Sequence, residues 1–458
     1  MDYLWTVKEL RRACGVATKG ADVDVLGISI DSRTVNKGDA FIALKNEKDG
    51  HDYVQKAYER GAVCAIVEKQ IDCPILQVVV PDTFKALYAM ADAQRSHSTG
   101  KRIGVTGSCG KTSVKELLAT ALHCHKSEAS YNNHWGVPLT LARMPRDEKF
   151  SVFEVGMNHP GEIAPLSELV QPDVAIITNV APAHIGAFTS IEDIVVEKTA
   201  ILEGLKDKKN LIVPLDLYQK YPHYFEVKPY TFSLEMNGQA DSYAEAVQSG
   251  ISGQNVVANI MGDLVKFTLS LQGDHQVLNA LAVLTAVKVV GADVQAAAAN
   301  IESQEAVAGR GKIEDINGVF VIDESYNANP KSMQIAIDML KKRPGMGRRV
   351  AILGEMLELG NQSESLHAQI APWCEGVDTV ITVGAGMKVV YDNLPKSVQK
   401  VHYPSQKEVN IQKLAGQLEV GDVVMVKGSN GTFWQWKFVP RLMNEIERLA
   451  RVLKNKKA

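Results

Sequence analysis

Residues 103–113, IGVTGSCGKTS, restrict the fold more than any other stretch of this 458-residue sequence. A short apolar strand enters a loop with two glycines, and the loop passes directly into a helix-forming run. Glycines let backbone N–H groups turn inward around phosphates, and a helix start adds positive potential. Lys111 would reach the outer phosphates of a nucleotide, and Thr112 would offer its hydroxyl to Mg²⁺. The segment predicts a nucleotide-binding α/β domain; an ordinary turn with a chance Gly-Lys-Thr is the alternative.

Two further strand candidates end in side chains that suit the same site. Residues 151–155 place Glu154 at a strand end, and residues 174–179 lead into His184. Ligands of open α/β sheets collect at the carboxyl ends of the strands, and Mg²⁺ prefers oxygen ligands. We therefore expect Glu154 to hold a metal ion and His184 to lie at the same edge. The alternatives are a solvated carboxylate and a structural histidine.

Two cations stand in unusual positions. Lys198 falls inside the apolar stripe of a helix that opens with a capping-box-like pair, Ser190 and Asp193. Its ammonium either extends to water or faces the phosphate site. Arg310 stands between two glycines at a change of pattern. It is either part of a solvated linker or a planar cation that reaches the terminal phosphate.

Length and pattern together indicate three domains, since 458 residues divided by about 150 gives three. Short strands before residue 100 indicate a small α/β module, and strands alternating with long helices then indicate a mostly parallel sheet and a second doubly wound unit. We expect an α/β chain with domains at 1–82, 83–308 and 309–458. The strand candidates are 25–30, 40–44, 62–67, 75–80, 102–106, 151–155, 174–179, 319–323, 349–353, 379–383 and 423–426, and the helix candidates are 82–97, 113–122, 332–342 and 364–372.

Charge and composition exclude several classes of protein. Lys and Arg total 50 against 53 acidic residues, so the chain has no basic excess for a nucleic-acid partner. No run of 18 apolar residues occurs, which predicts no membrane insertion. Six cysteines without a C-x-x-C pair fit reduced thiols in a cytosol and make a structural zinc site improbable.

Several runs, taken in order along the chain, resemble the Mur ligases of bacterial peptidoglycan synthesis. They are residues 106–112, YNNHWGVP at 131–138, Glu154, NVAPAH at 179–184, Lys198, His275 with Asn279, Gly309 with Arg310, DESYNANP at 323–330 and GEMLELG at 354–360.

The resemblance implies an ATP-dependent ligase of the bacterial cytoplasm. It would join D-alanyl-D-alanine to the terminal carboxylate of UDP-N-acetylmuramoyl-tripeptide through an acyl phosphate. The first domain would bind the UDP-sugar, the central P-loop domain would bind ATP, and a Rossmann-like C-terminal domain would bind the dipeptide. The resemblance also implies two Mg²⁺ ions and a carbamylated Lys198, which would give the second ion a carboxylate-like ligand. A monomer is favoured.

The resemblance also implies four sets of site residues. The catalytic set is Lys111, Lys198, His184 and Arg310. The ATP-binding set is Gly107, Ser108, Cys109, Gly110, Lys111, Thr112, Ser113, Asn279, Arg310, Asp323 and Tyr326. The substrate-binding set is Ser32, Arg33, His51, Asn132, Asn133, Asn327 and Asn329. The metal ligands are Thr112, Glu154, His184 and Lys198.

Some positions depart from the family pattern. Residues 44–51 form a shortened loop, Glu324 replaces a usual Asp, and Asn430 stands where Arg is commoner. Two alternatives remain: a ligase of the folylpolyglutamate synthase type, and a regulatory P-loop ATPase that joins no substrates. The roughly one hundred residues before the phosphate loop argue against the first.

Overall fold

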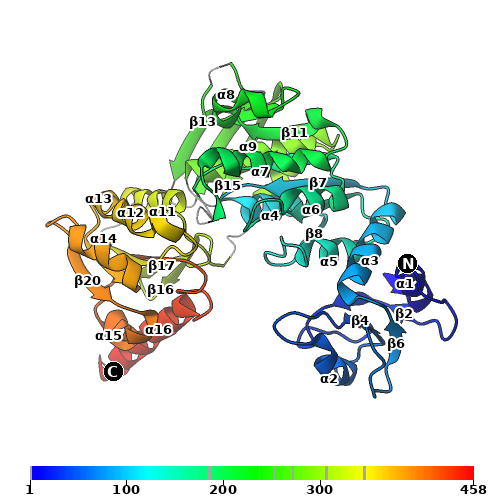
Figure 1. The fold of residues 1–458 in the computed structure, drawn as a ribbon. Helices are drawn as coiled ribbons and strands as arrows, with labels where there is room; N and C mark the ends of the chain where they lie inside the picture. Colours follow the sequence, from blue (N-terminus) through cyan, green and yellow to red (C-terminus); the bar gives the residue numbers. More distant parts are fainter. Residues whose placement is uncertain are drawn as a thin grey trace.

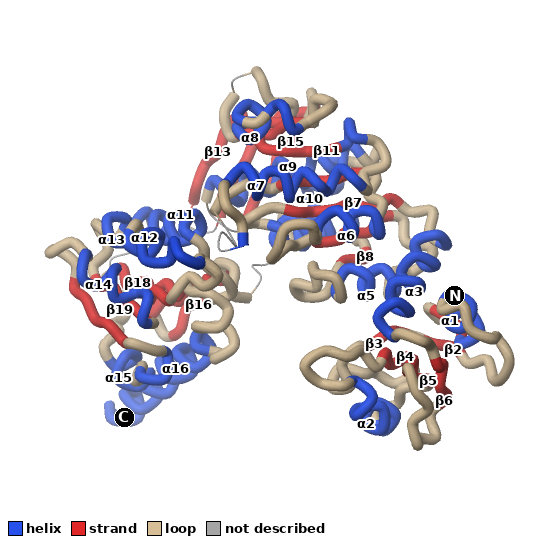
Figure 2. The backbone as a smooth tube through the Cα atoms, viewed as in Figure 1, coloured by secondary structure: helices blue, strands red, loops and turns tan. Residues whose placement is uncertain are grey.

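The computed structural model describes residues 3–182, 187–236, 238–250, 253–270, 273–304, 308–343 and 347–457. Three bodies built on separate sheets follow one another along the chain (Figure 1). The N-terminal body (blue) and the C-terminal body (yellow to red) lie apart, each beside the central one (cyan to green). Helices lie against strands in all three bodies (Figure 2), which confirms the predicted α/β fold class. In the described ranges no helix is long and apolar enough to cross a membrane.

The N-terminal body contains a four-stranded parallel sheet and a two-stranded antiparallel one. The single strand expected at 25–30 is wrong: the Leu26 N–H bonds the Gly38 carbonyl at 2.9 Å, and the segment splits between the two sheets. The helix expected at 82–97 is present, and Asp82 caps its start by accepting the N–H groups of Phe84 and Lys85. The elements are β1 (Trp5–Thr6), α1 (Val7–Ala13), β2 (Asp24–Val25), β3 (Gly27–Ser29), β4 (Asp39–Ile42), α2 (Val54–Glu59), β5 (Cys64–Val67), β6 (Leu76–Val79) and α3 (Thr83–His97).

The central body is built on a nine-stranded sheet in the order β15-β14-β13-β12-β11-β10-β7-β9-β8. The strands from β8 through β9, β7, β10, β11 and β12 to β13 pair in parallel, as predicted. Strands β14 and β15 then add an antiparallel edge next to β13. Met261 and Gly262 both have positive φ, as a two-residue hairpin between β14 and β15 needs. The strands are β7 (Lys101–Thr106), β8 (His125–Lys126), β9 (Phe150–Glu154), β10 (Val174–Ile177), β11 (Leu211–Pro214), β12 (Tyr230–Ser233), β13 (Ser242–Gly250), β14 (Gly253–Ile260) and β15 (Asp263–Leu269).

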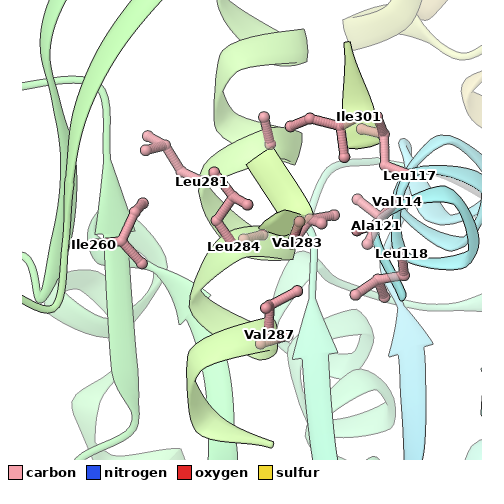
Figure 3. Packing of buried hydrophobic residues seen from close by; sticks show 14 of the residues in the cluster. Val114, Leu117, Leu118, Ala121, Ile260, Leu281, Val283, Leu284, Val287 and Ile301 are labelled. Carbon is pink, nitrogen blue, oxygen red and sulfur yellow. The ribbon is translucent and has the colours of Figure 1, made fainter. Parts of the chain in front are cut away.

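Helices cover this sheet with apolar side chains. Figure 3 shows Val114 and Leu118 facing Val283 and Val287. A second cluster includes Ile194, which lies on the helix that carries Lys198. The helices are α4 (Lys111–Leu122), α5 (Gly136–Ala142), α6 (Ile163–Val170), α7 (Ile191–Thr199), α8 (Leu215–Lys220), α9 (Asp274–Val289) and α10 (Val294–Ile301).

The C-terminal body has a six-stranded sheet in the order β16-β17-β21-β18-β19-β20, in which β16 alone is antiparallel. The helix expected at 364–372 is wrong as a single element. Pro372 has no N–H for the Ala368 carbonyl, and the segment forms two short helices. The elements are β16 (Lys312–Ile316), β17 (Val319–Glu324), α11 (Pro330–Lys342), β18 (Arg349–Gly354), α12 (Ser363–Ala368), α13 (Ile370–Trp373), β19 (Thr379–Val383), α14 (Lys388–Asn393), β20 (Gln399–Tyr403), α15 (Ile411–Gly416), β21 (Val423–Lys427) and α16 (Phe438–Lys457).

The N-terminal core continues into the central body. Leu139 and Ala142 of α5 belong to the same buried cluster as Trp5 and Leu87. The Trp5 indole N–H donates to the Ala142 carbonyl at 2.8 Å. Burial of these large side chains therefore ties the first sheet to the body that carries the phosphate loop.

Candidate active site

The phosphate loop joins β7 to α4 and is shaped by the polar end of β10. The Cys109 N–H donates to Asn179 Oδ1 at 3.0 Å, and the Thr178 hydroxyl donates to the Cys109 carbonyl at 2.5 Å. Gly107 has φ +146°, and a Cβ there would lie 1.9 Å from Thr178 Oγ1. A Cβ on Gly110 would lie 2.9 Å from Asn279 Oδ1, which places Asn279 against the loop. Glycine is therefore required at Gly107 by both conformation and space.

Thr112 and Glu154 meet at the start of α4, as the sequence predicts. The Thr112 hydroxyl donates to Glu154 Oε2 at 2.8 Å, and the Asn132 amide donates to Glu154 Oε1 at 2.8 Å. Glu154 is only 1% exposed. The Lys111 ammonium bonds the Gly107 carbonyl at 2.7 Å, and burial lowers its pKa although Glu154 opposes the shift. A hydroxyl, a carboxylate and a cation thus converge beside the loop.

Lys115, which sequence reasoning missed, lies one turn after Lys111 and is fully buried. Its ammonium donates to the Ser127 and Ala129 carbonyls and lies 4.0 Å from Glu154 Oε2. A lysine four residues after the loop lysine was the available signal, because positions i and i+4 share one helix face.

Lys198 does not extend to water. The side chain is 2% exposed, and Met157 Sδ lies 3.8 Å from its nitrogen. Burial lowers the pKa of Lys198 well below its ordinary value, and Lys111 lowers it further. The predicted capping box of Ser190 and Asp193 is confirmed. The snorkelling interpretation is therefore wrong, and His184, its predicted neighbour, lies outside the described residues.

Arg310 is held at the junction of the central and C-terminal bodies. Its guanidinium lies 4.3 Å from the centre of the Tyr326 ring, and one nitrogen lies 3.4 Å from Ser130 Oγ. The Trp434 ring contacts Tyr326 edge-on, with centroids 5.3 Å apart. These contacts contradict the solvated-linker interpretation. Trp434 is a second residue that sequence reasoning missed, because it lies more than one hundred residues from its partner.

Some of the predicted residues 323–330 contact the segment around Gly309, and others contact the phosphate loop. Asp323 accepts the Gly309 N–H at 2.9 Å, and burial raises its pKa. Asn329 caps α11, and its amide donates to Cys109 Sγ at 2.9 Å, so the C-terminal body touches the phosphate loop. Asn327 uses its side-chain oxygen on the Ala328 N–H.

Of the remaining predicted residues, Asn133 makes local contacts, whereas the Ser108 hydroxyl donates to the distant Ala181 carbonyl at 2.9 Å. Asn133 accepts the N–H groups of Trp135 and Gly136 at the start of α5. Ser32 is buried, and Ser108 and Ser113 lie in the phosphate loop and the first turn of α4.

In the N-terminal body, both His51 ring nitrogens are occupied: Nδ1 lies 2.6 Å from Asp49 Oδ1 and Nε2 accepts the Glu68 N–H at 2.8 Å. Arg33 is exposed and pairs with Asp31 at 2.6 Å. His51 therefore shapes the altered 44–51 loop, while Arg33, although exposed, is held by both oxygens of the Asp31 carboxylate.

Three family models match the chain in order. Residues 24–97 match the Mur ligase family catalytic domain, residues 105–287 the Mur ligase middle domain, and residues 309–430 the Mur ligase, glutamate ligase domain.

Relatives match along nearly the whole chain. UDP-N-acetylmuramoyl-tripeptide–D-alanyl-D-alanine ligase of Rickettsia prowazekii is 32% identical, with 93% of this chain and 97% of the relative covered. The ligase of the same name from Escherichia coli is 33% identical, with 83% and 86% covered. MurF from Acinetobacter baumannii has a TM-score of 0.82 at 27% identity, with 96% and 99% covered. MurF from Thermotoga maritima, solved with ADP, has a TM-score of 0.77 at 26% identity, with 92% and 98% covered. The chain belongs to the Mur ligase family.

Proposed function

We propose that the chain is an ATP-dependent ligase that joins D-alanyl-D-alanine to the terminal carboxylate of UDP-N-acetylmuramoyl-tripeptide. The single observation that carries the proposal is the phosphate loop with the Thr112–Glu154 pair at its base. Relatives of that name, 32–33% identical over most of the chain, support the choice of substrates. The ADP-bound relative supports ATP as the nucleotide.

We propose one domain for each substrate. Residues 1–82 would bind the UDP-sugar through Ser32, Arg33 and the loop that ends at His51. Residues 83–308 would bind ATP, and residues 309–458 would bind the dipeptide. The bond from Asn329 to Cys109 supports this division, because it brings the proposed dipeptide domain to the phosphate loop.

The ATP-binding roles follow from position. Loop amides and Lys111 would hold the phosphates, and Asn279, against Gly110, would contact the nucleotide. Tyr326 would act from the C-terminal side together with Arg310. Asn132 would orient the Glu154 carboxylate rather than bind substrate, since its amide is already committed there.

The residues at the loop fit Mg²⁺. In the described part of the chain no three His, Cys, Asp or Glu side chains gather to hold a metal by themselves. Mg²⁺ on a nucleotide needs only one or two protein ligands besides phosphate oxygens, and Thr112 with Glu154 supplies a hydroxyl and a carboxylate. When bound, the ion would neutralise negative charge on the phosphates.

A carbamylated Lys198 is proposed as a ligand for a second ion, together with His184. Burial lowers the pKa of Lys198 and so favours the uncharged amine, which is the form that is nucleophilic toward CO₂; the resulting carbamate would be an oxygen ligand. We expect Lys198→Ala to be inactive and to recover part of its activity with added short-chain carboxylates. No rescue would favour an unmodified lysine, and full activity without a carboxylate would contradict any catalytic role.

The proposed reaction has two steps. A carboxylate oxygen of the tripeptide attacks the γ-phosphorus of ATP, and ADP leaves. The free amine of the dipeptide then attacks the acyl carbon, loses a proton and expels phosphate. Anion approaches anion in the first step, so Lys111 and Arg310 contribute by placing positive charge at the phosphates.

The proposed function is tested by phosphate release with UDP-muramoyl-tripeptide, with and without D-alanyl-D-alanine. We expect release that requires both. Release without an acceptor would favour a regulatory ATPase, and release with a folate would favour the folylpolyglutamate alternative. We place the enzyme in the bacterial cytoplasm, and its six free cysteines support a reducing compartment.

A further inference from the structure

Lys427 is a buried cation for which the proposed reaction has no use. It ends β21, which lies between β17 and β18 in the C-terminal sheet, and it is 2% exposed. Its ammonium lies 3.2 Å from Glu324 Oε2 and donates to the Asn327 carbonyl at 3.1 Å. Glu324 and Lys427 are direct neighbours on the paired strands. An ammonium leaves water only where acceptors replace it, so these two contacts are what hold Lys427 in place.

The two acceptors lie on either side of Tyr326. The segment from Asp323 to Asn329 is held at its start by the bond from the Gly309 N–H to Asp323, and at its end by the bond from Asn329 to Cys109. In the middle, Lys427 supplies two contacts in addition to the bond from the Tyr326 N–H to the Gly309 carbonyl. Because it bonds residues before and after Tyr326, it restrains the backbone that carries this ring.

The Tyr326 ring is the surface on which Arg310 lies. The guanidinium is 4.3 Å from the ring centre, and the Tyr326 N–H bonds the Gly309 carbonyl at 3.1 Å. A shift of this segment would therefore move the Tyr326 ring and Arg310 together. A displacement of about 1 Å at such a group lowers turnover by up to roughly a hundredfold.

We propose that Lys427, paired with Glu324, is a positioning residue that holds Tyr326 beneath Arg310 and so keeps the guanidinium at the phosphate site. The inference rests on the proposed function. It adds to that function a residue in the C-terminal sheet that acts through Tyr326 rather than by touching a substrate.

The test compares Lys427→Met with Lys341→Met in the complete ligase reaction. Lys341 is a control in the same domain that has the same kinds of partner, although its side chain is more exposed. Its ammonium bonds the Trp373 carbonyl at 3.0 Å and the Asp338 carboxylate at 2.8 Å. It lies at the other end of α11 from Asn329, about 18 Å along the helix. Rates are normalised to the folded fraction, measured by circular dichroism.

We expect Lys427→Met to lower kcat about tenfold to a hundredfold and to leave the KM for the UDP-tripeptide within twofold of wild type. Lys341→Met should keep the wild-type kcat. A Lys427→Met enzyme with a normal kcat would overturn the inference, and so would an equal loss in Lys341→Met. A wild-type protein that forms no product at all would instead refute the proposed function.

A second pair of variants applies if Lys427→Met does not fold. Glu324→Gln keeps an oxygen that can accept from Lys427, whereas Glu324→Leu does not. We expect Glu324→Gln to retain a higher kcat than Glu324→Leu, and amide hydrogen exchange across residues 325–328 to be faster in Glu324→Leu. Equal kcat values and equal exchange in the two variants would overturn the inference.

Discussion

Lys111→Met removes the cation of the phosphate loop with little change in volume. In the structure the ammonium bonds only the Gly107 carbonyl within the loop, at 2.7 Å, and lies near Glu154 and Arg310. Its burial lowers its pKa, so the charge is not a source of folding stability there. We expect the free energy of unfolding to change by less than about 1 kcal/mol, the scale of one neutral hydrogen bond.

Turnover should respond far more strongly. One preorganised electrostatic contact in a water-excluded site contributes about 3–4 kcal/mol to transition-state stabilisation. At about 1.4 kcal/mol for each factor of ten, the loss corresponds to a kcat lower by roughly 10²–10³.

The assay is phosphate release with saturating UDP-tripeptide and D-alanyl-D-alanine, together with urea unfolding of the same preparation. Affinity for the UDP-tripeptide should stay at the wild-type level, because we assign that substrate to the first domain. Near-normal turnover in Lys111→Met would refute the assignment of the loop. A loss of turnover that only parallels a loss of folded protein would refute the electrostatic reasoning.

Three further changes have defined outcomes. Gly107→Ala should abolish ATP binding in calorimetry, because its Cβ would lie 1.9 Å from Thr178 Oγ1; normal affinity would contradict the loop geometry. Burial raises the pKa of Asp422, but its paired contact with Arg348 outweighs this and the net pKa is lowered. The stabilisation from the Asp422 carboxylate is present above about pH 4 and is lost as the pH falls below that value. The free energy of unfolding should therefore fall more steeply with decreasing pH in wild type than in Asp422→Asn, and equal slopes would contradict the pairing. Trp5→Phe leaves a carbonyl of α5 unbonded and should lower the free energy of unfolding by about 1–3 kcal/mol in urea, whereas no change would argue against that bond.

Local signals predicted the parts of the fold that depend on local interactions. The glycines before Lys111 have the positive φ values that this loop needs, and the capping box at Ser190 satisfies backbone groups within a few residues. The errors occurred where pairing or packing decided the outcome. Residues 25–30 divide between two sheets because Val25 pairs with Trp5, a partner that periodicity does not identify.

The same distinction applies to the site. Thr112 and Glu154 were predicted because strand ends of a parallel sheet meet at one edge. Trp434 and Lys427 were missed, since each acts on residues about one hundred positions earlier. A lysine that ends an apolar strand, as Lys427 does, was the signal that was available.

In the proposed reaction the tripeptide carboxylate is phosphorylated before the amide bond forms. The most direct measurement uses UDP-muramoyl-tripeptide with ¹⁸O in both oxygens of the terminal carboxylate, followed by mass spectrometry of the released phosphate. Because the acyl phosphate keeps one carboxylate oxygen on phosphorus when the amine attacks, we expect one ¹⁸O in each phosphate. Phosphate free of label, with the product formed, would show that no acyl phosphate forms.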